Sequence, residues 1–342
     1  MVTFDYYLLN TYVPEAEGSA SELYARWVEQ IVLAEELGFG CAWLTEHHFH
    51  PFGGMLPSPQ LLIAALASRT SRIRMGPAVT ILPLHNPVRI AEDMAMLDVL
   101  TGGRLEVGVG RGMGNQYYDV FGADPSTAQQ KFEEQVAMLR TAWSDEPLRW
   151  DGAFFHCPRP VNVTPKPVQR PHPPLWIPVN ADLAHARWVG QQSINLMTLP
   201  WYPPTFAPTR RLIDEYRAGL KERERPEQSC EVLAYLTAYV GETPERAQRE
   251  AEPHWEAYRH VAADQRGGPE VAPLSYETGA ATSRCVFGDA EMCRQHVRRL
   301  RDELGIDRLA LRFDFGGMAQ DLVLASMRRF ASEVAPVLAW DN

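Results

Sequence analysis

The sequence contains few cysteines, and their arrangement is not that of a disulfide framework. There are five in 342 residues, an odd number, and no two form a Cys-x-x-Cys pair. Small secreted domains stapled by disulfides carry an even set at close spacing, so that class is excluded. A reducing compartment is therefore expected.

Long apolar runs and positive charge are also scarce. No stretch approaches the ~20 apolar residues that a helix needs to cross a bilayer, and no basic segment precedes the first apolar run. The 33 Lys and Arg residues are outnumbered by 43 Asp and Glu residues, which gives a formal net charge of -10. A nucleic-acid-binding face would need clustered basic residues. We expect a cytoplasmic protein that binds neither a membrane nor a nucleic acid.

What the chain does have is enough material for a large core. It is 45% hydrophobic and 22% charged. Length alone would suggest two domains of ~150 residues each. An α/β barrel of ~250 residues with long loop insertions accounts for the length equally well.

Strand-like and helix-like segments alternate along the whole chain, as in parallel strands joined by crossover helices. A capping box at Ser19 to Glu22 and the pair Asn86-Pro87 mark two helix starts. Eight strand-helix units predict an α/β fold, a (β/α)8 TIM barrel with insertions, over residues 1–342 as a single domain. The predicted strands are residues 4–9, 41–44, 73–82, 105–109, 175–179, 194–199, 232–240 and 308–315.

Two segments interrupt the alternation. Residues 147–174 are rich in proline and aromatic residues, which indicates a surface insertion with a short hairpin. Residues 264–283 contain glycines, prolines and few aliphatic residues, and we interpret them as a mobile lid within the domain.

Active sites of such barrels lie at the carboxyl ends of the strands, so the residues after each strand are the candidates. The second strand is followed by Glu46, His47 and His48, with His50 nearby. Histidine titrates near neutral pH, so this group could move protons, bind a metal or contact an electron-rich ring. The alternative is a histidine that only bonds within its loop.

Two further strand ends could hold a phosphate group. Arg111 lies between Gly110 and Gly112, where backbone N–H groups and a guanidinium can approach an anion closely. Residues 180–182, Asn-Ala-Asp, open a helix whose free N–H groups favour anions, although Asp182 is more simply explained as an N-cap. An exposed arginine in a plain turn remains the alternative at Arg111.

Trp201, next to a proline at the sixth strand end, is a candidate for an apolar pocket wall. A competing hypothesis is a hydrolytic metal held by His48, His50 and Asp314. The sequence offers no further strand-end ligand to complete that set, so we predict no metal site.

Several of these motifs together resemble the bacterial luciferase-like flavin-dependent monooxygenases. The similarity rests on motifs spread in order over nearly the whole chain. They include Glu46-His47-His48-Phe49, Ile81-Leu82-Pro83 with His85-Asn86-Pro87, Gly102-Gly103-Arg104, Gly110-Arg111-Gly112 and Ser326-Met327-Arg328-Arg329-Phe330. The resemblance implies a luciferase-like TIM barrel that binds reduced FMN from a separate flavin reductase. The flavin would react with molecular oxygen to a hydroperoxide that oxygenates a small organic substrate.

Carried over by position, His47 is similar to the family's catalytic histidine and Arg111 to its phosphate-binding arginine. Trp201 resembles a tryptophan near the flavin or substrate. Ala78-Val79 occupies the place of a non-proline cis peptide behind the flavin ring. The resemblance gives the following cofactor-binding residues: Glu46, Ala78, Val79, Arg111, Met113, Asn180 and Ala181.

The chain also departs from the family pattern. Ala181 stands where luciferases have a hydroxyl, and Gly114 replaces an aromatic residue near the phosphate arginine. Phosphate binding is then expected to depend more on Arg111 and on backbone N–H groups. His48 is interpreted as structural.

Three alternatives to a two-component monooxygenase remain at this point. They are a deazaflavin-dependent oxidoreductase of the same superfamily, a non-catalytic flavin-binding partner subunit and the metal-dependent hydrolase. The expected assembly is a homodimer, with an unlike pair as the alternative.

Overall fold

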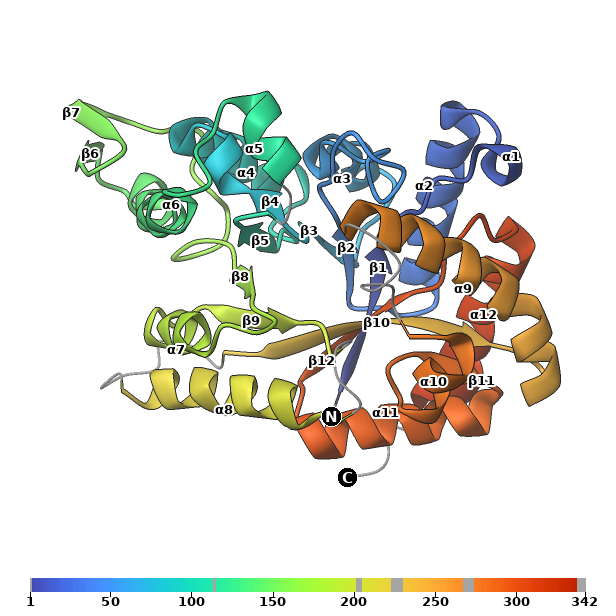
Figure 1. The fold of residues 1–342 in the computed structure, drawn as a ribbon. Helices are drawn as coiled ribbons and strands as arrows, with labels where there is room; N and C mark the ends of the chain where they lie inside the picture. Colours follow the sequence, from blue (N-terminus) through green and yellow to red (C-terminus); the bar gives the residue numbers. More distant parts are fainter. Residues whose placement is uncertain (1, 113–114, 201–204, 223–229, 267–273, 337–342) are drawn as a thin grey trace.

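Parallel strands form a nearly closed barrel surrounded by helices (Figure 1). The structure is a computed structural model and describes residues 2–112, 115–200, 205–222, 230–266 and 274–336. The strands follow one another around the barrel in the order β3, β2, β1, β12, β10, β9, β8, β5 and β4, with every neighbouring pair parallel. Their bounds are β1 Thr3–Leu8, β2 Cys41–Leu44, β3 Arg74–Pro77, β4 Thr80–Ile81, β5 Val107–Gly110, β8 Leu175–Pro178, β9 Asn195–Thr198, β10 Val232–Val240 and β12 Arg308–Arg312. The predicted (β/α)8 TIM barrel is confirmed.

The third barrel strand is divided into two parts, and each part pairs with a different neighbouring strand. Its first half, β3, pairs with β2, and its second half, β4, pairs with β5. A bridge from Met75 to Leu105 joins β3 to the chain just before β5. The peptide between Ala78 and Val79, inside the break, is cis, as predicted.

Alternating glycines on and just after β5 make room for this broken strand. A Cβ on Gly108 would lie 2.2 Å from the carbonyl oxygen of Pro77, and one on Gly110 would lie 2.6 Å from Val79. Real Cβ atoms do not approach other heavy atoms that closely, so only glycine fits. The glycine spacing seen in the sequence thus serves strand packing beside the cis peptide.

Helices cover the outside of the barrel, and two of their predicted starts are confirmed. Ser19 and Glu22 form a capping box, and the Asn86 side chain accepts hydrogen bonds from the N–H groups of Val88 and Arg89. The helices are α1 Pro14–Glu17, α2 Ala20–Glu36, α3 Pro59–Ala67, α4 Pro87–Leu100, α5 Asn115–Phe121, α6 Ala128–Trp143, α7 Leu183–Gln191, α8 Ala207–Lys221, α9 Pro244–Arg266, α10 Tyr276–Ala281, α11 Ala290–Leu304 and α12 Gln320–Arg329. Among the described residues, none of them is both long and apolar enough to span a bilayer.

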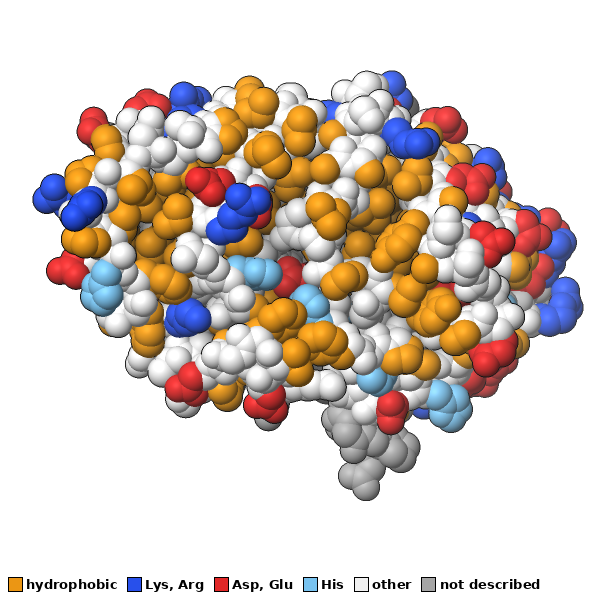
Figure 2. Space-filling view, turned by 90° about the horizontal axis from the view of Figure 1, so that it is seen from above, with side chains coloured by type: hydrophobic (Ala, Val, Ile, Leu, Met, Phe, Trp, Pro, Cys, Tyr) orange, Lys and Arg blue, Asp and Glu red, His pale blue; other side chains and the backbone are white. Residues whose placement is uncertain are grey.

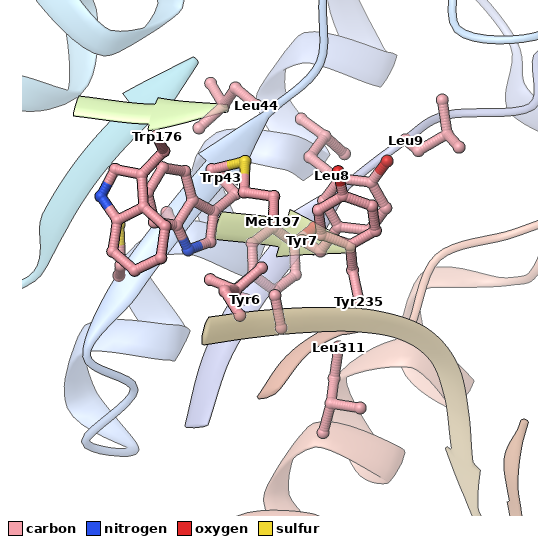
Figure 3. Close-up of a cluster of buried hydrophobic side chains, with 14 of the residues drawn as sticks. Tyr6, Tyr7, Leu8, Leu9, Trp43, Leu44, Trp176, Met197, Tyr235 and Leu311 are labelled. Atoms are coloured by element: carbon pink, nitrogen blue, oxygen red, sulfur yellow. The ribbon is translucent and has the colours of Figure 1, made fainter. Parts of the chain in front are cut away.

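The amino-terminal half of the barrel interior is filled by buried charges held between indole rings. Arg308 donates to both carboxylate oxygens of Asp5, at 2.9 and 3.1 Å, and Trp43 donates to Asp5 at 2.9 Å. Trp176 donates to Glu106 at 2.7 Å. Figure 3 shows the two tryptophans among the buried side chains of this interior. This half of the barrel interior is a packed core. The open space of the barrel lies at the carboxyl ends of the strands.

The two predicted interruptions take different forms. Residues 147–174 contain an antiparallel hairpin, β6 Leu148–Asp151 and β7 His156–Val161, which lies beside α6 and away from the barrel (Figure 1). Residues 264–283 are more regular than expected, because α9 extends to Arg266 and Ser275 caps α10 through the N–H of Thr278. Residues 267–273 lie outside the described part, and the lid stays a prediction. A short strand that was not predicted, β11 Val286–Gly288, extends the sheet beside β10.

Candidate functional site

One cavity of about 340 Å³ lies at the carboxyl ends of the strands, where the sequence placed the chemistry. The view from above shows hydrophobic side chains around a few histidine and acidic side chains near the middle of the face (Figure 2). The volume is within the ~300–1,000 Å³ typical of small-molecule sites. The lining residues are Tyr7, Leu9, Glu46, His47, Phe52, Ala78, Val79, Ile81, Arg111, Gly112, Tyr117, Pro178, Val179, Asn180, Ala181, Asp182, His185, Leu199 and Tyr235.

His47 lies in the turn after β2 and is held from three sides. Its Nδ1 atom is 3.2 Å from the hydroxyl oxygen of Tyr117. The ring packs edge-to-face against Phe52, with 5.3 Å between centroids. Gly53 lies behind it with a φ of 76°, and a Cβ there would be 2.6 Å from the imidazole. The packing and the hydrogen bond to Tyr117 thus orient His47.

Glu46 is buried and connects three segments. One carboxylate oxygen accepts hydrogen bonds from His48 at 3.2 Å and His85 at 3.1 Å, and the other accepts from the N–H of Ile81 at 3.3 Å. Burial raises the pKa of the Glu46 carboxyl, but the bonds from His48 and His85 outweigh it and leave the pKa below its usual value. The carboxylate therefore stays charged and links the β2 turn to β4. Its predicted contact with a cofactor remains a prediction.

Ala78 and Val79 form an apolar wall of the cavity. Both residues are partly exposed, and the glycines of β5 lie close to the Pro77 carbonyl and to the side chain of Val79. A wall without polar side chains suits the face of a flat ring system.

A cation and a helix start also line the cavity. Arg111 is exposed beside Gly112, and its carbonyl oxygen accepts a hydrogen bond from Tyr118 at 2.5 Å. Asn180 accepts from the N–H of Leu199 at 2.8 Å, which ties the ends of β8 and β9 together. Asp182 accepts from the N–H of His185 at 3.0 Å, so the prediction that it is an N-cap is confirmed.

His185 is a further cavity residue, one that the sequence did not single out. It lies in the first turn of α7, and its side chain lines the cavity. Burial lowers the pKa of His185, and the positive charge of Arg111 lowers it further. The imidazole is therefore neutral at pH 7.

The three proposed metal ligands point to different partners. His48 donates to Glu46, His50 is 2.9 Å from Asp264, and Asp314 accepts from Gln30 at 3.1 Å. They do not form a ligand set, and the described residues contain no group of three or more His, Cys, Asp or Glu side chains that could hold a metal ion. This removes the geometric basis of the hydrolase hypothesis.

Two predicted site residues, Met113 and Trp201, lie outside the described residues. Sequence reasoning missed Tyr7, Tyr117 and Tyr235. Tyr7 and Tyr235 stack on each other at 4.9 Å and line the cavity (Figure 3). Their strands, β1 and β10, are buried along most or all of their length, so the sequence carried no alternation that would single out the two tyrosines. Tyr117 gave no signal either, because it reaches the site from α5.

The sequence model of the luciferase-like monooxygenase family matches residues 4–308. This chain belongs to that family. Membership in the luciferase-like monooxygenase family supports an oxidoreductase and agrees with the resemblance seen in the sequence. The oxygenase component of a flavin-dependent trigonelline monooxygenase from Acinetobacter baylyi is 26% identical over 339 residues, which cover 93% of this chain and 91% of the relative.

Solved structures share the fold over almost the whole chain. Monooxygenase RslO1 from Streptomyces bottropensis has a TM-score of 0.91 at 25% identity, covering 98% of this chain and 100% of that one. The oxygenating constituent of 3,6-diketocamphane monooxygenase from Pseudomonas putida, in complex with FMN, has a TM-score of 0.82 at 17% identity, with 98% of each chain covered. An F420-dependent secondary alcohol dehydrogenase has a TM-score of 0.73 at 19% identity, covering 98% of this chain and 99% of that one.

Proposed function

We propose that this chain is the oxygenase component of a two-component monooxygenase. It would use reduced FMN from a separate flavin reductase, together with molecular oxygen, to oxygenate a small organic substrate. The observation that carries the proposal is one cavity lined by His47, by Arg111 and by the apolar pair Ala78-Val79. The trigonelline relative, named as the oxygenase component of its system, supports the requirement for a reductase.

The residues present fit the chemical parts of FMN. The apolar wall of Ala78 and Val79 suits a flat ring, and Arg111 with the first turn of α7 suits a phosphate. Asp182 would repel a phosphate, but its carboxylate is engaged as the N-cap. Reduced FMN, when bound, supplies the electrons that activate oxygen for transfer to an organic molecule.

The protein's own contribution is to position, to exclude water and to handle a proton. Tyr7, Phe52 and Tyr235 add aromatic surface to the cavity, and a largely apolar cavity keeps water away from a reactive group. His47 is the cavity residue suited to hold or move a proton beside the ring, because imidazole exchanges protons near neutral pH.

Rapid mixing tests the proposal. The purified chain is mixed with reduced FMN without oxygen, oxygen is then admitted, and the return of oxidised FMN is followed by its absorbance. We expect a slow phase that is absent for FMN alone and is altered in His47→Gln. Reoxidation at the rate of free FMN would contradict the proposal. Binding of reduced F420 in preference to reduced FMN, with hydride transfer and no oxygen uptake, would favour the deazaflavin branch.

The homodimeric state and the cytoplasmic location stay predictions. Light scattering on the purified chain distinguishes a homodimer from a monomer. A chain that binds reduced FMN but gives no product alone would point to a required unlike subunit.

A further inference from the structure

Tyr117 links the two histidines that follow β2. It comes from α5, on the loop after β5, and its side chain is 2% exposed. Its hydroxyl oxygen is 3.2 Å from Nδ1 of His47, and its ring packs edge-to-face against His48 with 5.2 Å between centroids. It also lines the cavity. A tyrosine from a distant segment therefore touches the proposed proton-handling side chain.

The direction of the hydrogen bond between Tyr117 and His47 follows from the burial of the hydroxyl group. Tyr117 is 2% exposed, and a buried hydroxyl hydrogen that is left without an acceptor is costly. Burial, with the negative charge of Glu46 adding to it, raises the pKa of Tyr117, so the phenol keeps its hydrogen at neutral pH. The hydroxyl hydrogen therefore needs an acceptor. Among the described residues, Nδ1 of His47 is the acceptor in contact with the hydroxyl, at 3.2 Å.

An Nδ1 atom that accepts a hydrogen bond carries no proton of its own. In a neutral imidazole the proton is then on Nε2, because one ring nitrogen donates and the other accepts. The hydrogen bond made by one nitrogen sets the protonation of the other.

We propose that Tyr117 is a positioning residue that donates its hydroxyl hydrogen to Nδ1 of His47 and holds this imidazole as the neutral tautomer protonated on Nε2. His47 then presents a hydrogen-bond donor at Nε2, suited to an oxygen atom that gains negative charge. The consequence for turnover rests on the proposed oxygenase function. The tautomer itself does not, because it is a property of the protein without FMN.

Two tyrosine-to-phenylalanine variants separate positioning from general packing. Tyr117→Phe keeps the ring and removes only the hydroxyl, so the packing against His48 is preserved. Tyr216→Phe is the matched control, because Tyr216 is equally buried and its hydroxyl donates to the carbonyl of Ile194 at 3.0 Å, away from the cavity. Each variant loses one buried hydrogen bond, and only the first loses the contact with His47.

The test is nuclear magnetic resonance of the full chain, labelled with ¹⁵N on its histidine rings and free of FMN. Correlation of ring protons with ring nitrogens reports which nitrogen is protonated, and His47→Gln identifies the signals of residue 47. We expect wild type and Tyr216→Phe to show an unprotonated Nδ1 and a protonated Nε2. Tyr117→Phe should show a mixture of tautomers.

Two results would overturn the proposal: protonation on Nδ1 in the wild type, or an unchanged tautomer in Tyr117→Phe. The wild-type spectrum decides the first point even if the variant folds poorly. In the rapid-mixing assay, Tyr117→Phe should change the slow phase by about 2- to 10-fold, the factor that one net hydrogen bond represents. A wild type without the slow phase would refute the oxygenase function and leave the tautomer result standing.

Discussion

Replacing Gly53 by alanine tests how tightly the turn after β2 holds His47. Gly53 has a φ of 76°, and an added Cβ would lie 2.6 to 2.9 Å from three His47 atoms, Cδ2, Cγ and Cβ. Because His47 also contacts Phe52 and Tyr117, its ring cannot yield without losing one of those contacts. We expect Gly53→Ala to displace the imidazole.

The magnitude has two parts. A left-handed backbone costs an L-residue roughly 1–2 kcal/mol. Losing the hydrogen bond between His47 and Tyr117 adds about 0.5–1.5 kcal/mol. The free energy of unfolding should therefore fall by about 1.5–3.5 kcal/mol in Gly53→Ala. Gly38→Ala is the control, because Gly38 has a φ of 84° and a Cβ there meets nothing within 4 Å. Gly38→Ala therefore lowers the free energy of unfolding only by the cost of the left-handed backbone.

Urea unfolding of the two variants gives the difference, and the histidine signals of residue 47 show whether the ring has moved. The slow phase of FMN reoxidation should be disturbed in Gly53→Ala and kept in Gly38→Ala. Equal losses of stability in both variants, with unchanged His47 signals, would refute the reasoning.

Three further predictions concern single side chains. His47→Ala should keep FMN binding and lose product formation, measured by titration and turnover; unchanged turnover removes His47 from the mechanism. Arg111→Met should raise the dissociation constant of reduced FMN by about 10- to 100-fold, since hydrogen bonds between charged groups are worth about 1.5–3 kcal/mol. Riboflavin, which lacks the phosphate, should bind both proteins alike, and an equal loss for both ligands would speak against a phosphate contact. Burial, with the charge of Asp314 adding to it, raises the pKa of Glu17 from 4.5 to about 8. The stability from this group is then complete below pH ~4.5 and is lost as the pH rises through about 8. Glu17→Gln should unfold with a weaker pH dependence between these limits, and a curve parallel to wild type would contradict the assignment.

Much of the fold could be predicted because the barrel strands are short runs bounded by turn residues. All eight were placed correctly, but residues 73–82 were expected to form one unbroken strand. The segment instead divides into β3, which pairs with β2, and β4, which pairs with β5. The unexpected pieces, α5, α10 and β11, are short. Their sequences carry little periodicity, and contacts with the rest of the protein decide their structure.

The candidate site was predictable where a residue directly follows a strand. His47, Arg111 and Asn180 do so, and all three line the cavity. Tyr117 and His185 do not, because they lie on helices and the way these helices pack brings them to the cavity. The sequence could not show that Tyr117 contacts His47, since the two residues are 70 positions apart.

A crystal structure of the chain with FMN, grown without oxygen, would test the central claim most directly. The account predicts the ring of FMN against Ala78 and Val79, the phosphate on the guanidinium of Arg111 and the ring edge within reach of His47. FMN bound outside this cavity, or inside it with the phosphate away from Arg111, would contradict the account.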